Sequence, residues 1–285
     1  MLGKLFKNEF KATWKLMVCV FGVILVLAEL VALFDRTGFM ESSLANNPFM
    51  SVATKFITIM FVLALMFLAL FCFIVCSMRF YKTMYSEQGY LTHTLPVDPL
   101  STFFVKVVVS TVWVFASVIM FALSLLIQAA ASNDTNVFHI IIELCKHLFN
   151  REELAILNEK IMTASGCGIW GLIGLLVLLV LVLVIYAILW IYTSMTVGQL
   201  STNHKAGMSV LTGICLYLAG QIGSIYLLVK IFGKMGVSLA SSGEDVLAAF
   251  TGADFFWVLI GVFAGICLIE ALIDCIIIKK KINLQ

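Results

Sequence analysis

Charged residues are scarce in this chain. Only 12% of its 285 residues are charged, about half the share of an ordinary soluble protein, while 62% are hydrophobic. A chain of this composition has too little polar surface to enclose its apolar residues in water. The sequence therefore excludes an ordinary soluble domain and predicts a membrane protein.

The chain also lacks the short motifs of several enzyme classes. It has no G-x-x-x-x-G-K-[ST] phosphate loop, no H-E-x-x-H, no G-x-S-x-G and no C-x-x-C. His139, Glu143 and His147 are best interpreted as one solvated helix face, because a straight helix cannot bring all three to one ion. Most of the cysteines fall in apolar stretches, and whether Cys145 and Cys167 pair is left open. We expect no enzymatic activity, metal or resident cofactor in this chain.

Long uncharged stretches identify the membrane spans. Roughly 20 apolar helical residues cross a bilayer core, because lipid offers the backbone no hydrogen-bond partner. The predicted fold class is an all-α membrane protein with six transmembrane helices, an N-terminal amphipathic helix and short outer helices, in a single transmembrane domain over residues 1–285. The predicted spans are 15–35, 56–78, 107–131, about 168–193, 205–230 and about 255–278.

Basic residues gather on one side of these spans. By contrast, the loop 132–160 has three basic and five acidic residues, and the loop 233–254 has one and three. Because positively charged segments stay in the cytoplasm, both termini and the segment 79–98 are expected inside. The basic positions that flank the spans are Lys4, Lys7, Lys11, Lys15, Arg79, Lys82, Lys205, Lys279, Lys280 and Lys281.

Three further segments have their own patterns. Residues 1–15 predict an amphipathic helix on the inner membrane surface, and a basic retention signal is the alternative interpretation. Apolar stripes in 132–162 predict two short outer helices. The stretch 233–253 predicts an outer loop with a short helix that begins near Ser242.

Acidic side chains are rare inside the predicted spans. Glu29 lies near the outer end of the first span, and Glu270 lies deeper in the sixth. Because a carboxylate in lipid is costly, both are candidates for a proton path, a substrate cavity or an interhelix contact. Asp274 is one turn from Lys279 and is expected at the inner membrane surface.

The segment 79–98 is the most polar of the cytoplasmic pieces and is rich in aromatic residues. Phe80 and Met84 stand at helical spacing and predict a short inner helix, which the following prolines prevent from continuing. Asp98 and Pro99 form a favourable N-cap and first-turn pair for the next helix. We therefore expect a short helix, a turn and re-entry into the membrane.

Two stretches of this segment have a familiar composition. They are Arg79-Phe80-Tyr81-Lys82 and Glu87-Gln88-Gly89-Tyr90-Leu91-Thr92, followed by Thr94-Leu95-Pro96. They resemble the arginine-aromatic-tyrosine-lysine and glutamate-glycine-tyrosine-leucine-threonine segments of bacterial type-2 ABC transporter permeases, especially those of Gram-positive bacteria. Gln88 departs from the commoner pattern, in which glutamate directly precedes glycine.

The resemblance implies the membrane subunit of an ATP-driven exporter in a bacterial cell membrane. A separate ABC ATP-binding subunit would hold ATP and magnesium and dock on this segment, the coupling helix. The residues that the resemblance assigns to docking are Arg79, Tyr81, Lys82, Glu87 and Tyr90.

A second permease chain and membrane lipid are the other partners that the resemblance implies, and no nucleic acid is expected. The two permease chains would form a pathway that opens alternately inward and outward. Two alternatives stay open: a membrane sensor or partner subunit that transports nothing, and an ion-coupled carrier that uses Glu29 or Glu270. The apolar spans do not identify the substrate.

Overall fold

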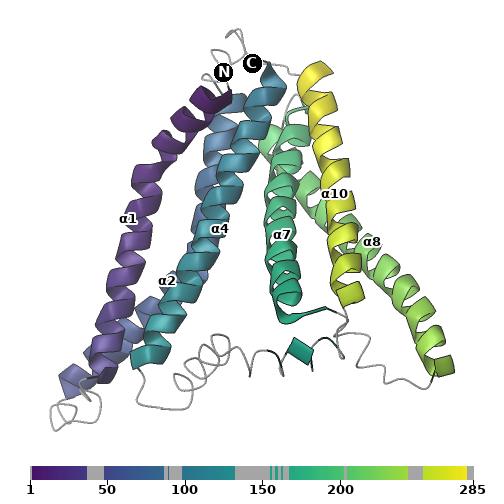
Figure 1. The fold of residues 1–285 in the computed structure, drawn as a ribbon. Helices are drawn as coiled ribbons and strands as arrows, with labels where there is room; N and C mark the ends of the chain where they lie inside the picture. Colours follow the sequence, from purple (N-terminus) through teal and green to yellow (C-terminus); the bar gives the residue numbers. More distant parts are fainter. Residues whose placement is uncertain are drawn as a thin grey trace. The chain divides into compact units, whose positions relative to one another are not determined.

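The computed structural model describes most of the apolar part of the chain. The described residues are 2–36, 48–86, 89, 98–131, 155, 158–159, 162, 167–201, 204–242 and 253–280. Its long elements are all α-helices, and six of them are long and apolar enough to cross a membrane (Figure 1). They are α1 (Leu2–Arg36), α2 (Pro48–Met84), α4 (Pro99–Ala131), α7 (Ile169–Gly198), α8 (Lys205–Ser242) and α10 (Ala253–Lys280). The predicted fold class, an all-α membrane protein with six transmembrane helices, is confirmed.

The helices divide into two compact units. One unit comprises residues 1–76 and 112–151, and the other comprises residues 77–111 and 152–285. The long helices α2 and α4 therefore each contribute residues to both units. The segment that the resemblance singles out begins within the second unit.

In the first unit, α1 is tied to α4 by an aromatic contact. The Phe10 ring stacks on Trp113 with 4.7 Å between ring centroids, and Trp113 Nε1 donates a 2.8 Å hydrogen bond to Thr13 Oγ1. Further along, Gln128 Nε2 donates a 2.8 Å hydrogen bond to the carbonyl of Ala28. Residues 2–15 are helical, as predicted, but they are continuous with the first span. No proline or glycine interrupts the chain between Gly3 and Gly22, so one helix runs through both.

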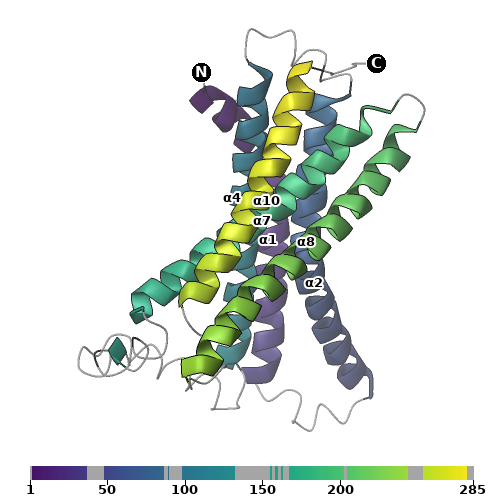
Figure 2. The ribbon, with the colours of Figure 1, turned by 90° about the vertical axis from the view of Figure 1, so that its right-hand side faces the viewer.

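In the second unit, α7 packs against both α10 and α8, while α8 and α10 touch only lightly (Figure 2). The Tyr186 and Phe263 rings lie 5.4 Å apart between α7 and α10. Toward α8, Trp190 Nε1 donates a 3.0 Å hydrogen bond to the carbonyl of Gly213. α7 is therefore the central helix of this unit.

Two helix boundaries differ from the prediction. The short inner helix around Phe80 is the last part of α2, because nothing before it breaks the helix. α4 begins at Pro99, as Asp98 and Pro99 predict, so the uncharged stretch 107–131 is the later part of a helix that continues through Lys106.

The second difference is at the end of α8. This helix continues to Ser242, so the first ten residues of the predicted outer loop are helical and Ser242 ends a helix instead of starting one. Gly233 and Gly236 weaken a helix by about 1 kcal/mol each, but the stretch contains no proline that would stop it. Residues 243–252 and nearly all of the predicted outer helices in 132–162 lie outside the described residues.

Candidate functional site

The end of α2 has one exposed and one buried face. Tyr81 is 39% exposed and Lys82 is also exposed, whereas Phe80 and Met84, one helical turn apart, are almost completely buried. Arg79 is half-buried. Two of the predicted docking residues, Tyr81 and Lys82, therefore lie at the surface of the second unit. Phe80 and Met84, on the opposite face of the same helix, are buried in that unit.

The other two predicted docking residues, Glu87 and Tyr90, lie outside the described residues. Beyond α2, the Gly89 amide donates a 2.7 Å hydrogen bond to the carbonyl of Ser86. The proposed start of the next helix is confirmed: α4 begins at Pro99, and the Leu100 amide donates to Asp98 Oδ1 at 3.4 Å. This distance makes the side-chain cap a weak one.

Three aromatic rings hold the buried face of α2. Phe80 stacks on Tyr192 of α7 with 3.8 Å between centroids and 6° between ring planes. Phe103, at the start of α4, meets both rings at a steep angle. The Tyr192 hydroxyl shares a 2.6 Å hydrogen bond with Ser110 of α4. We call these residues, Phe80, Phe103, Ser110 and Tyr192, the aromatic anchor.

A tyrosine just after α2 makes a second link to α7. The buried Tyr85 hydroxyl donates a 2.9 Å hydrogen bond to Thr196 Oγ1, which in turn donates to the carbonyl of Tyr192 at 2.8 Å. Burial raises the pKa of Tyr85 above its ordinary value, so its hydroxyl keeps its proton and remains a donor. The position of the segment after α2 is therefore coupled to α7.

Replacing Tyr85 by phenylalanine is expected to lower the free energy of unfolding by about 1 kcal/mol, because Thr196 loses its buried donor. The effect should depend on pH. Because the folded protein holds the Tyr85 proton more tightly than the unfolded chain does, wild-type stability should fall once pH exceeds about 10. The variant lacks this group and should lose less stability there. Unfolding curves in detergent at neutral and alkaline pH measure both effects, and parallel curves for the two proteins would contradict the role of Tyr85.

The acidic candidates have very different surroundings. Glu29 on α1 is exposed, whereas Glu270 on α10 is 4% exposed. The side chain of Asp274 is 0% exposed and accepts a 3.0 Å hydrogen bond from Thr193 of α7, and its position at the inner membrane surface stays a prediction. Asp274 lies on the same helix face as Glu270 and faces α7. Among the described residues, no group of three histidine, cysteine or acidic side chains could hold a metal ion.

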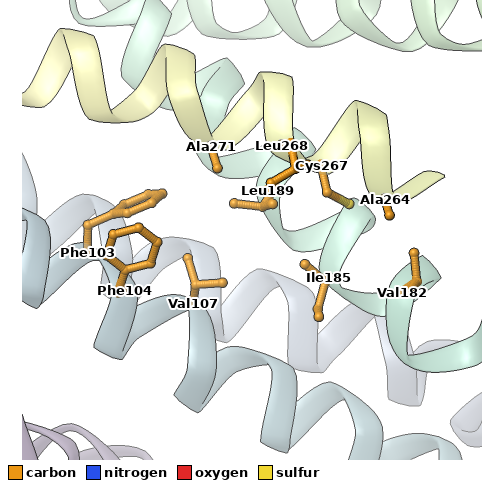
Figure 3. Close-up of a pocket in the computed structure, with 10 residues that line it drawn as sticks. All are labelled: Phe103, Phe104, Val107, Val182, Ile185, Leu189, Ala264, Cys267, Leu268 and Ala271. Atoms are coloured by element: carbon orange, nitrogen blue, oxygen red, sulfur yellow. The ribbon is translucent and has the colours of Figure 1, made fainter. Parts of the chain in front are cut away.

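An apolar pocket lies beside the aromatic anchor, between α4, α7 and α10 (Figure 3). Its volume is about 360 Å³, and it has no charged side chain in its wall. Phe103 belongs both to the pocket wall and to the aromatic anchor, so the pocket borders the link to α2. The lining residues are Phe103, Phe104, Val107, Val182, Ile185, Leu189, Ala264, Cys267, Leu268 and Ala271.

The sequence alone did not reveal the aromatic anchor or the Tyr85–Thr196 hydrogen bond. One signal was available, since Tyr192, Thr193 and Thr196 are polar residues at the end of an otherwise apolar span. Polar side chains in such a position commonly bond to neighbouring helices.

The class of protein that the composition and the six helices define is a multi-pass α-helical membrane protein. No family model, no curated protein and no solved structure matches the chain. A more particular assignment therefore depends on the segment after α2 and on what the end of α2 contacts.

Proposed function

We propose that the chain is the membrane subunit of an ATP-driven ABC exporter, with the end of α2 and the segment after it as the docking site for a separate ATP-binding subunit. The observation that carries the proposal is the two-faced end of α2. Tyr81 and Lys82 face outward, while Phe80 and Tyr85 bind to α7. A partner that moved the exposed face would thereby move α7.

The contacts of α7 connect the end of α2 with the membrane-spanning part of the second unit. α7 also lines the apolar pocket and packs on α10. A shift of α7 would therefore change the pocket between α4, α7 and α10, which alternating access requires of a substrate site. In this proposal the ATP-binding subunit supplies ATP and magnesium, two membrane subunits form the pathway, and both termini lie in the cytoplasm of a bacterial cell.

Charge reversal at the docking face is expected to weaken the complex. In Lys82→Glu, attraction to an acidic group of the partner becomes repulsion, and we expect the amount of copurified ATPase to fall about tenfold, as for the loss of about 1.4 kcal/mol of binding free energy. Glu87→Lys should act in the same way. The measurement is ATP hydrolysis per mole of membrane subunit after purification from native membranes.

The matched control is Lys55→Glu, which makes the same charge change at an exposed position near the other end of α2. This variant should retain all of its ATPase. Equal recovery of ATPase with Lys82→Glu and Lys55→Glu, at equal expression, would refute docking at the end of α2. If a proton gradient drove flux without any ATPase, the ion-coupled carrier would be the correct function.

A further inference from the structure

Glu270 and Asp274 form a close pair of carboxyl groups inside the second unit. They lie four residues apart on α10, so their Cβ atoms are about 5–6 Å apart on one helix face. Their side chains are 4% and 0% exposed. Glu270 Oε2 and Asp274 Oδ1 are buried without a hydrogen-bond partner. Each of these two oxygen atoms lacks the donor that a buried carboxylate needs.

The groups of α7 that interact with the pair are neutral. Thr193 donates one hydrogen bond to Asp274 Oδ2, and Thr196 also interacts with this carboxyl group. Tyr186 of α7 interacts with Glu270 and also with Tyr217 of α8. None of these hydroxyl groups can neutralise a carboxylate.

The remaining groups that interact with the pair or lie next to it are one tyrosine, two thiols and one lysine. Tyr85, after α2, interacts with Asp274, and Cys267 interacts with Glu270. Cys275 lies between Asp274 and Lys279, but Lys279 is exposed. On α4, Lys106 is buried in the same unit, and its relation to the pair is tested below.

Two negative charges at this spacing inside protein would be destabilising. Each charge has lost its hydration, and the two carboxylates repel one another. One proton removes one charge and supplies an O–H donor to an oxygen that has none. A metal ion fits poorly, because Ca²⁺ takes six to eight oxygen ligands and Mg²⁺ needs an octahedral set. The described part of the chain shows no such set around the pair.

We propose that Glu270 and Asp274 form a buried binding site for a single exchangeable proton. This property goes beyond ATP-driven export, which requires no proton site in the membrane subunit. It concerns the chemistry of α7 and α10 and does not depend on whether the partner is an ATPase.

The test is infrared difference spectroscopy of the full chain in lipid vesicles. At neutral pH the wild-type protein should show a carbonyl band of a protonated carboxylic acid, although exposed acids are then ionised. The band should shift in D₂O, since the proton exchanges, and it should disappear reversibly at alkaline pH. Glu270→Gln/Asp274→Asn should abolish it, and each single variant should shift its frequency.

Three controls make the result decisive. Glu29→Gln, which changes an exposed acid of α1, should leave the band unchanged. Replacing choline by Na⁺ at constant ionic strength should also leave it unchanged, whereas loss of the band in Na⁺ would show a metal-ion site instead. Lys106→Met should have no effect, and a stronger band in this variant would show that Lys106 neutralises the pair. Absence of the band from folded wild-type protein would overturn the proposal without reference to any variant.

Discussion

Replacing Tyr192 by alanine is expected to lower the free energy of unfolding by about 3 kcal/mol. Tyr192 is 1% exposed, and its ring stacks on Phe80 and meets Phe103. Each aromatic pair contributes about 0.5–1.5 kcal/mol beyond burial, and removal of the ring also leaves a cavity. This loss is at the lower end of the range for replacing a buried aromatic residue by alanine, because lipid is as apolar as the protein interior.

Detergent-induced unfolding followed by tryptophan fluorescence measures this loss. Tyr192→Phe keeps the rings and removes only the hydrogen bond to Ser110, so it should cost about 1 kcal/mol. Tyr217→Ala is the matched control, because the same side chain on α8 is 48% exposed. It should lower the free energy of unfolding by no more than about 1 kcal/mol, the contribution of its tilted ring contact with Trp190 at 5.9 Å. Equal losses for the two alanine variants would show that the aromatic anchor contributes no special stability.

Replacing Gly198 by alanine is expected to destabilise the protein by about 1–3 kcal/mol. An added Cβ at this last residue of α7 would overlap the Ser209 hydroxyl and lie 2.7 Å from Ser209 Cα. A side chain can rotate away, but a backbone atom of α8 cannot. The ends of α7 and α8 would therefore have to separate.

Gly207→Ala is the control for this change. The nearest atom to an added Cβ at Gly207 is His204 Cβ, 4.0 Å away. In the first turn of α8, alanine should instead stabilise the helix, by no more than about 1 kcal/mol. Opposite signs for the two substitutions are the expected result in the same unfolding assay, and partial rescue of Gly198→Ala by Ser209→Gly would locate the clash. A neutral Gly198→Ala variant would contradict the close approach of the two helices.

The spans were predictable because lipid imposes a simple rule on sequence. A helix surrounded by lipid has to be apolar all round, so uncharged stretches such as 56–78 reveal it without knowledge of its neighbours. Helix ends were predictable only where a local signal marks them, as Asp98 and Pro99 do. α2 and α8 continue beyond their apolar stretches and end at Met84 and Ser242. The length of an apolar stretch and the charges that flank it do not predict these helix ends.

The site was predictable only in part, for a different reason. A motif singled out Tyr81 and Lys82, which are exposed, and helical spacing grouped Phe80 with Met84, which are both buried. The contacts of Phe80 with Tyr192 and of Thr193 with Asp274 join residues far apart in sequence. Such pairs depend on how helices pack, and the periodicity of a single helix does not contain that information.

The hydroxyl groups of this protein also bear on the order in which its helices enter the membrane. Ser117, Ser124 and Ser224 each donate to a carbonyl of their own helix, so these groups are satisfied before any helix meets another. α10 differs, because Thr193, which donates to its Asp274, belongs to α7. An acid in a lone helix is costly on insertion, by up to about 2.5–3.5 kcal/mol at the helix centre and less toward its end, where Asp274 lies. α7 leaves the ribosome first, so the donor for Asp274, 81 residues earlier in the chain, is already synthesised when α10 forms.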